Sequence, residues 1–181
     1  GALRHCAVIP VAGNQVTSDI AKIFRTPLTH AEQIKVQFAS ARSSTVSRED
    51  SIEVPSVGGR PSRSMSRHTL AEVVEPRYQE LFELVLKQLQ DSGLEDQIAA
   101  GIVLTGGTSS ISGAVEIAEA TFGMPVRVAS PLPVKGLYEY VDQPIYSTGI
   151  GLLHYGARRV IERQFERPER QGVTSFLNRV K

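Results

Sequence analysis

The residues best suited to chemistry are a pair of glycines that follow a short apolar segment. Residues 101–104 read Gly-Ile-Val-Leu, and Thr105 leads directly into Gly106, Gly107 and Thr108. Two glycines after a strand let backbone N–H groups approach a phosphate without an intervening Cβ, and a following helix adds the positive end of its dipole. The segment lacks the Gly-Lys-Ser/Thr of a P-loop and the dinucleotide-binding fingerprint. A tight strand-to-helix turn without a ligand explains the same residues, so the pattern alone leaves both interpretations open.

Apolar spacing predicts the elements that would position this loop. Helices are expected at residues 16–24, 31–41, 70–90, 113–122 and 144–161, and strands at 3–9, 52–57, 101–104 and 125–129. Turns are expected at 13–14 and 58–66, the second of them mobile. Thr29-x-x-Glu32 and Thr69-x-x-Glu72 have the spacing of capping boxes, which predicts a helix start at each threonine.

The composition is that of an ordinary globular domain. The 181 residues carry 20 Lys and Arg against 19 Asp and Glu, a net charge of +1, which argues against a general nucleic-acid binder. The single cysteine, Cys6, excludes an internal disulfide, and no metal site is expected. No apolar run approaches the roughly 18 residues of a membrane-spanning helix. The chain shows no signal peptide and starts without Met, so we expect a cytoplasmic protein and a piece cut from a larger domain.

The C-terminal residues form two further segments. Residues 162–172 are charged and contain Pro168, which favours a flexible linker. The apolar residues that follow are spaced 0, 3, 4 and 7, which gives one helical stripe, and the segment is basic without an acidic residue. The residues of this segment are Val173, Phe176, Leu177, Arg179, Val180 and Lys181.

Several motifs occur in a characteristic order: VIPVAGNQVTSDIA, TPLTHAEQIK, VPSVGGRP, LAEVVEPRYQEL, AAGIVLTGGTSSISG and YSTGIGLLHYG. GIVLTGGTSSISG resembles the adenosine motif of the actin-like ATPase superfamily. The ordered set, from Leu3 to Gly156, resembles the bacterial cell-division family FtsA. The resemblance implies an α/β, actin-like (ribonuclease H-like) second lobe. Its inner subdomain would combine residues 1–26 and 99–161, and its outer subdomain would be inserted at 27–98.

The resemblance also implies an adenine-nucleotide site. Glu32 and Lys35 match a Glu-x-x-Lys pair that faces ribose and base, and a capping-box glutamate beside a solvated lysine is the alternative interpretation. The Gly-Asn turn would lie near the phosphates, and the glycine loop would hold adenine and α-phosphate by its backbone. The implied ATP-binding residues are Gly13, Asn14, Glu32, Lys35, Gly106, Gly107 and Thr108. The superfamily's first-lobe and Asp-x-Gly-x-x-Thr phosphate loops are absent from the sequence, so Mg²⁺ would be held mainly by the phosphates and the missing part.

The family's partner is the C-terminal peptide of the tubulin-like protein FtsZ. The EPRYQEL helix matches the segment that binds it, which implies roles for Arg77, Tyr78 and Glu80. A solvated ion pair between Arg77 and Glu80 is the competing interpretation. A basic segment that contains Arg60, Arg63 and Arg67 would face the next subunit of a filament, or be a solvated loop.

The resemblance implies a cell-division adaptor rather than a strong catalyst. Such a protein binds ATP, self-assembles like actin and meets other division proteins. It tethers FtsZ to the cytoplasmic face of the inner membrane at the septum, and the stripe at 173–181 matches the start of a membrane-targeting helix. At most weak ATPase activity is expected, with none in this piece alone and no assignable catalytic residue. A pilus-assembly adaptor, a sugar kinase and a chaperone-type ATPase of the same superfamily are the alternatives.

Overall fold

The computed structural model describes residues 3–58, 60–98, 100–134, 136 and 138–165. Its helices are α1 (Gly13–Phe24), α2 (Leu28–Phe38), α3 (Arg67–Asp91), α4 (Ala114–Phe122), α5 (Tyr138–Val141) and α6 (Ser147–Phe165). Its strands are β1 (Ser51–Val54), β2 (Arg63–Ser66), β3 (Ile102–Leu104) and β4 (Val126–Val128). Within these described residues, 3-10 turns lie at Ser43–Thr45, Glu95–Gln97, Gly107–Ser110 and Pro144–Tyr146.

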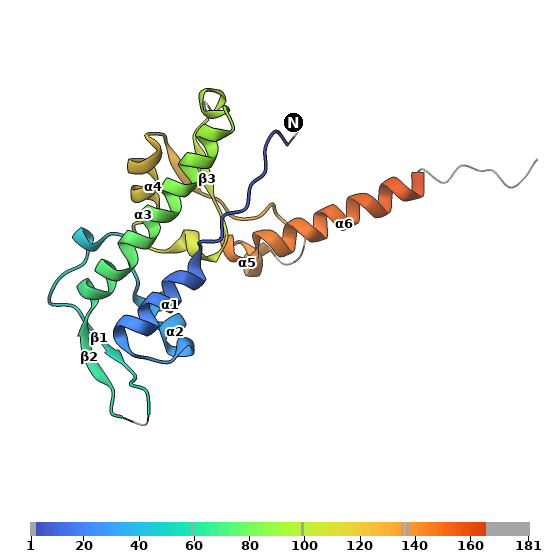
Figure 1. Ribbon diagram of the computed structural model, residues 1–181. Helices are drawn as coiled ribbons and strands as arrows, with labels where there is room; N and C mark the ends of the chain where they lie inside the picture. The colour runs from blue at the N-terminus through green and yellow to red at the C-terminus, as the bar shows by residue number, and fades with distance from the viewer. Residues whose placement is uncertain (1–2, 59, 99, 135, 137, 166–181) are drawn as a thin grey trace, which may run out of the picture.

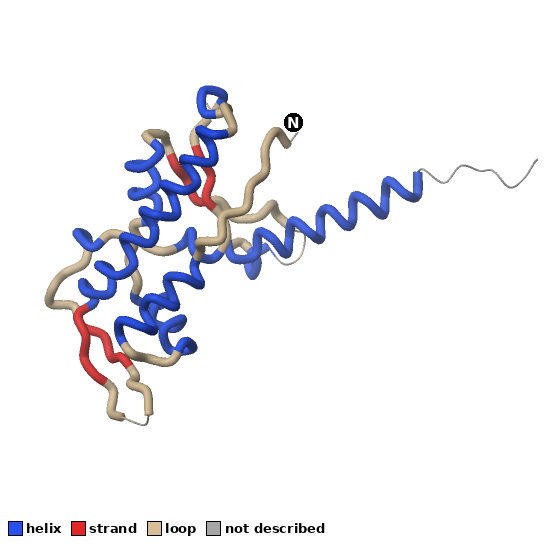
Figure 2. Tube along the Cα trace, viewed as in Figure 1, coloured by secondary structure: helices blue, strands red, loops and turns tan. Residues whose placement is uncertain are grey.

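Helix α3 is the central helix of the fold, and α1, α4 and β2 pack against it. It runs from the β1–β2 hairpin at one end to β3 at the other, with α1 and α2 on one side (Figure 1). The hairpin is antiparallel, with Ile52 opposite Met65, and β3 pairs with β4 in parallel, with Ile102 opposite Val126. Figure 2 shows how short these strands are beside the helices.

One hydrophobic core joins α1, α2, α3, α4 and the hairpin. Each of these elements turns an apolar face inward, because burying that surface stabilises the fold by about 25 cal/mol per Å². The largest fully buried side chains include Phe24, Ile20, Leu70, Val54 and Val74. A chain of edge-to-face aromatic contacts then runs from Tyr78 through Phe82 to Phe122 and joins α3 to α4.

Two predictions about strands are corrected by the structure. Residues 3–9 are not a strand, because no described strand lies beside them to accept their hydrogen bonds, and Leu3 and Val8 are more than four-fifths exposed. Residues 63–66 are not part of a mobile turn but form β2, which β1 and a bond from the Arg63 guanidinium to the Phe24 carbonyl hold in place. The strand at 101–104 is only half buried, with Val103 50% exposed.

The predicted helix starts are also corrected. Helix α1 begins at Gly13, so Gly13 and Asn14 form its first turn rather than a preceding turn. The Ala12 N–H donates to Gln15 Oε1 (2.9 Å) and the Gln15 N–H donates to the Ala12 carbonyl (3.0 Å). Neither capping box forms, because α2 starts after Pro27 and α3 starts after Ser66, upstream of the two threonines.

Helix α6 extends away from the body (Figure 1) and carries exposed apolar side chains. Leu152 and Leu153 are both 66% exposed, and the helix continues to Phe165, past Ile161 where the sequence predicts its end. Within the described ranges, no helix has the length and apolarity needed to cross a membrane. The division into inner and outer subdomains stays a prediction.

Candidate functional site

A cavity of about 700 Å³ lies where the start of α1, one face of α2 and the loop after β3 meet. Six of the seven predicted nucleotide-binding residues line it: Gly13, Asn14, Glu32, Lys35, Gly107 and Thr108. The seventh, Gly106, does not. Its φ of 91° requires glycine, and its N–H donates to the Pro144 carbonyl at 3.1 Å, which sets the course of the loop.

Lys35 joins the two helices that form this site. Its side chain is 6% exposed, and its ammonium donates to the Glu32 carboxylate (2.7 Å), the Thr17 hydroxyl (2.9 Å) and the Gly13 carbonyl (3.2 Å). An ammonium has three N–H donors, so all of them are engaged. Lys35 therefore binds α2 to α1 and brings positive charge to the wall. It has no spare donor for a base edge, which corrects that part of its predicted role.

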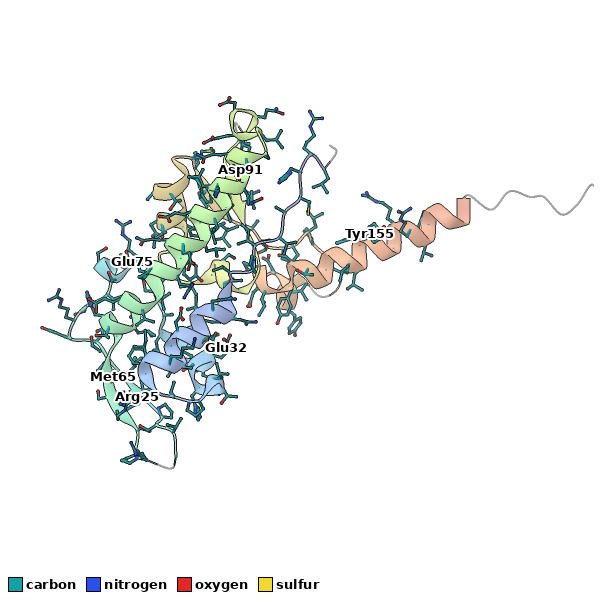
Figure 3. The ribbon with its side chains drawn as sticks, viewed as in Figure 1. Arg25, Glu32, Met65, Glu75, Asp91 and Tyr155 are labelled. Atoms are coloured by element: carbon teal, nitrogen blue, oxygen red, sulfur yellow. The ribbon has the colours of Figure 1, made fainter. Side chains whose placement is uncertain are left out.

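Glu32 is the acceptor that this network leaves available. Lys35 and Thr17 both donate to its Oε2, the latter at 2.5 Å, and the side chain is 49% exposed at the cavity. Partial burial raises the pKa of Glu32, but the hydrogen bonds from Lys35 and Thr17 and the Lys35 charge outweigh it and hold that pKa below its usual value. The carboxylate is therefore ionised at neutral pH and offers Oε1 to hydroxyl donors. Figure 3 shows Glu32 on α2.

Gly13 lies so close to another chain segment that a side chain at this position would clash with it, and its glycine does not serve a turn. A Cβ built on it would overlap the Thr108 side-chain methyl, and it would lie 3.4 Å from Lys35 Nζ. The first turn of α1 thus lies directly against the loop after β3. This contact joins the two chain segments that bear the predicted glycines.

The loop after β3 differs from the expected strand–loop–helix. A 3-10 turn follows Gly106, and α4 starts only at Ala114. The N-terminus of α4 is therefore not adjacent to Gly107, and the expected helix-dipole contribution at this loop is wrong. Instead, the polar groups that this loop brings to the cavity come from the 3-10 turn and the residues just after it.

Several cavity residues were missed by sequence reasoning. Val36 follows Lys35, and positions 32, 35 and 36 share one face of α2, so helical spacing could have identified it. Ile111 and Ile145 add apolar surface. Ile111 lies inside the GIVLTGGTSSISG motif, which could have identified it, whereas no motif marks Ile145. The remaining cavity residues that the nucleotide prediction missed are Ala12, Gln37, Ala39, Arg67, Ser110, Ser112 and Gln143.

The three predicted partner-binding residues separate into an outer pair and a buried tyrosine. The Arg77 guanidinium is bonded to Asp19 on α1 (2.7 and 2.8 Å) and to Glu80 one turn along α3. Tyr78 is 3% exposed, so its predicted surface role is corrected, since it lies in the core. Burial raises the pKa of Tyr78, which keeps its hydroxyl protonated, and this hydroxyl donates to the Thr108 carbonyl at 2.8 Å.

The predicted basic segment is not one cluster. Arg60 and Arg63 line a shallow hollow of about 260 Å³ with Arg25, beside the loop that joins β1 to β2. Arg67 starts α3, donates to the Phe38 carbonyl (2.9 Å), pairs with Asp50 (3.5 Å) and faces the large cavity. Arg67 therefore lies on a different surface from Arg60 and Arg63, so the three arginines do not form the single subunit contact that the sequence predicts.

The predicted membrane residues, 173–181, lie outside the described residues. The same holds for residues 166–172 of the predicted linker at 162–172. In the part of the chain that the structure describes, no group of three His, Cys, Asp or Glu side chains could hold a metal ion.

Comparison with known proteins identifies the family. A family model described as "Cell division protein FtsA" matches residues 1–151. The chain belongs to the FtsA family. Cell division protein FtsA of Pseudomonas aeruginosa is 59% identical over 159 residues, 88% of this chain, and that of Escherichia coli K12 is 49% identical over 189 aligned residues, 99% of this chain. The chain spans 38% and 45% of the lengths of these FtsA relatives. Membership in FtsA confirms the resemblance and sets aside the other families of the superfamily.

Solved structures bear on the fold of this FtsA chain. MreB5 of Spiroplasma citri bound to ADP has a TM-score of 0.61 at 18% identity, over 88% of this chain and 47% of that one. The same protein bound to AMPPNP has a TM-score of 0.59 at 20% identity, over 86% of this chain and 47% of that one. These likenesses confirm the predicted actin-like α/β fold.

Proposed function

We propose that this chain binds an adenine nucleotide in the 700 Å³ cavity and serves as part of a division adaptor that tethers FtsZ to the membrane. One observation carries the nucleotide assignment: segments far apart in the sequence bring Gly13, Glu32, Lys35 and Thr108 to one cavity. The actin-like MreB5 neighbours bound to ADP and AMPPNP support the same ligand class.

The chemistry of the cavity suits a nucleoside better than a free phosphate. The ionised Glu32 carboxylate can accept hydrogen bonds from ribose hydroxyls, whereas its charge repels a free phosphate anion. Val36, Ile111 and Ile145 offer apolar surface to a base, and backbone groups of the 3-10 turn can contact the α-phosphate. Lys35 is engaged with the protein and acts on a ligand through its charge.

Calorimetric titration of the 181-residue chain tests this assignment. We expect saturable binding of ATP and of adenosine, with no binding of inorganic triphosphate, because the Glu32 carboxylate repels a bare anion. Failure of ATP to bind at millimolar concentration, or equal binding of triphosphate, would contradict the nucleotide assignment.

The adaptor half of the proposal rests on Arg77. It is half-buried on α3, and its bonds to Asp19 and Glu80 hold the guanidinium in place, so its remaining N–H donors are offered in a fixed orientation to an acidic peptide residue. Self-assembly into an actin-like filament, in which Arg60 and Arg63 take part, and contacts with other division proteins follow the family resemblance. So does attachment of 173–181 to the cytoplasmic face of the inner membrane at the septum.

Arg77→Glu is expected to weaken binding of the FtsZ C-terminal peptide at least tenfold, because it replaces an attractive charge by a repulsive one at about 1.4 kcal/mol per factor of ten. Fluorescence anisotropy with labelled peptide measures the change. Arg127→Glu on β4 is the matched control, since its side chain is exposed and lies on another element. Equal weakening by both variants would mean that only net charge matters, and would contradict the assignment of Arg77.

A further inference from the structure

Tyr78 is the one residue of the EPRYQEL segment that bonds to the loop of the proposed nucleotide site. It is 3% exposed on α3, and its hydroxyl donates to the backbone carbonyl of Thr108 at 2.8 Å. Residues 78 and 108 are thirty positions apart, so this bond joins two distant segments. A buried phenol that donates to a loop carbonyl fixes that carbonyl's direction as well as satisfying its own polar group.

The bonded carbonyl lies at a sensitive point of the cavity wall. The Thr108 side chain contacts Gly13, and Thr108 lines the cavity. Apart from Tyr78, the Thr108 carbonyl receives only a long 3.4 Å bond from the Ile111 N–H, within the same turn. The hydroxyl of Tyr78 is therefore the strong contact between this part of the loop and the rest of the fold.

The neighbouring residue on α3 holds the other side of the same junction. Arg77 pairs with Asp19 of α1, and α1 begins at Gly13 against Thr108. Helix α3 thus makes two contacts at this junction. Through Tyr78 it holds the loop, and through Arg77 it holds α1, the helix that the loop contacts. A small hollow between these elements is lined by Gly13, Arg77, Tyr78 and Thr108 among others, which places the four residues together.

We propose that Tyr78 is a positioning residue for nucleotide binding: its hydroxyl holds the Thr108 carbonyl so that the 107–110 turn keeps the shape that receives the nucleotide. This inference rests on the nucleotide assignment made above and extends it to a residue that does not line the cavity. Tyr78 acts through Thr108 and need not touch the ligand. The competing explanation is that Tyr78 only fills the core beside Phe82.

Tyr78→Phe removes the hydroxyl and keeps the ring, so it separates the two explanations. We expect ATP binding to weaken about three- to tenfold, the size expected for loss of one neutral hydrogen bond. Phe122→Leu is the core control, because Phe122 is 6% exposed and contacts Phe82 but not the loop carbonyl. It should lower the melting temperature more than Tyr78→Phe does, yet leave ATP affinity within about twofold at a temperature where all variants are folded.

Hydrogen exchange of the ligand-free chain provides a readout that does not depend on ATP. Tyr78→Phe should speed amide exchange selectively at residues 107–111, whereas Phe122→Leu should not. Unchanged exchange and unchanged ATP affinity in Tyr78→Phe would overturn the inference and leave the nucleotide assignment intact. Equal changes in both variants would show general loosening and would also overturn it. If wild type fails to bind ATP, the nucleotide assignment fails, and a selective exchange effect would then support only the role of Tyr78 in shaping the loop.

Discussion

Lys35→Ala is expected to weaken ATP binding by about 30-fold or more. The substitution removes the ammonium that joins the Glu32 carboxylate, the Thr17 hydroxyl and the Gly13 carbonyl. The Lys35–Glu32 pair lies within the protein, so its loss acts on ATP by removing the positive charge at the cavity wall and by releasing the Glu32 carboxylate that would accept from the ribose. A hydrogen bond to a charged group contributes about 1.5–3 kcal/mol, and the half-exposed Glu32 places this case at the lower end. A loss of about 2 kcal/mol corresponds to the stated factor at about 1.4 kcal/mol per factor of ten.

Lys22→Ala is the control for this experiment. Lys22 lies on α1 and is exposed, so its loss changes net charge equally without touching the cavity. Calorimetric titration of both variants with ATP measures the difference. Equal affinities in Lys35→Ala and wild type, with both folded, would mean that the lysine network does not shape the binding site.

Gly113→Ala is expected to lower the free energy of unfolding by about 2–5 kcal/mol. Gly113 has a φ of 81°, where a Cβ costs about 1–2 kcal/mol. That Cβ would also lie 2.9 Å from the backbone nitrogen of Arg42, which a side-chain rotation cannot relieve, and such overpacking costs about 1–3 kcal/mol. The strain falls beside Ser112, whose carbonyl accepts the Ala41 N–H at 2.7 Å and so joins the end of α2 to the loop.

Gly123→Ala separates the two contributions. Gly123 also has a positive φ, 63°, but a Cβ at this position would have no atom within 4 Å, so only the conformational cost of about 1–2 kcal/mol is expected there. Urea unfolding followed by circular dichroism gives both values. An effect of Gly113→Ala no larger than that of Gly123→Ala would contradict the close approach to Arg42.

The sequence predicts which residues line the cavity better than it predicts why those residues are needed there. The Glu-x-x-Lys spacing places Glu32 and Lys35 on one helical face, and the structure puts both at the cavity. The reason for Gly13 could not be predicted, because the side chain it must avoid, Thr108, is remote in sequence and meets it only in the folded chain. The engagement of all three Lys35 donors depends on the same distant packing of α1 on α2.

In the fold, too, features set by neighbouring residues are predicted, and features set by packing between distant segments are not. Helix α3 and the Gly123 stop of α4 follow from local patterns. The buried face of α3 runs through Tyr78 and Phe82, because the position of α4 decides which side of the helix is covered. Strand β2 has almost no apolar residue and exists through its pairing with β1, which composition alone does not reveal.

The most direct test of the central claim is a map of the ATP site by backbone-assigned NMR of the 181-residue chain. Addition of ATP should shift the amide resonances of Gly13, Lys35, Gly107 and Thr108, which line one cavity, and leave those of Arg60 and Arg63 at the hairpin unchanged. Shifts confined to the hairpin, or no shifts at saturating ATP, would contradict the account.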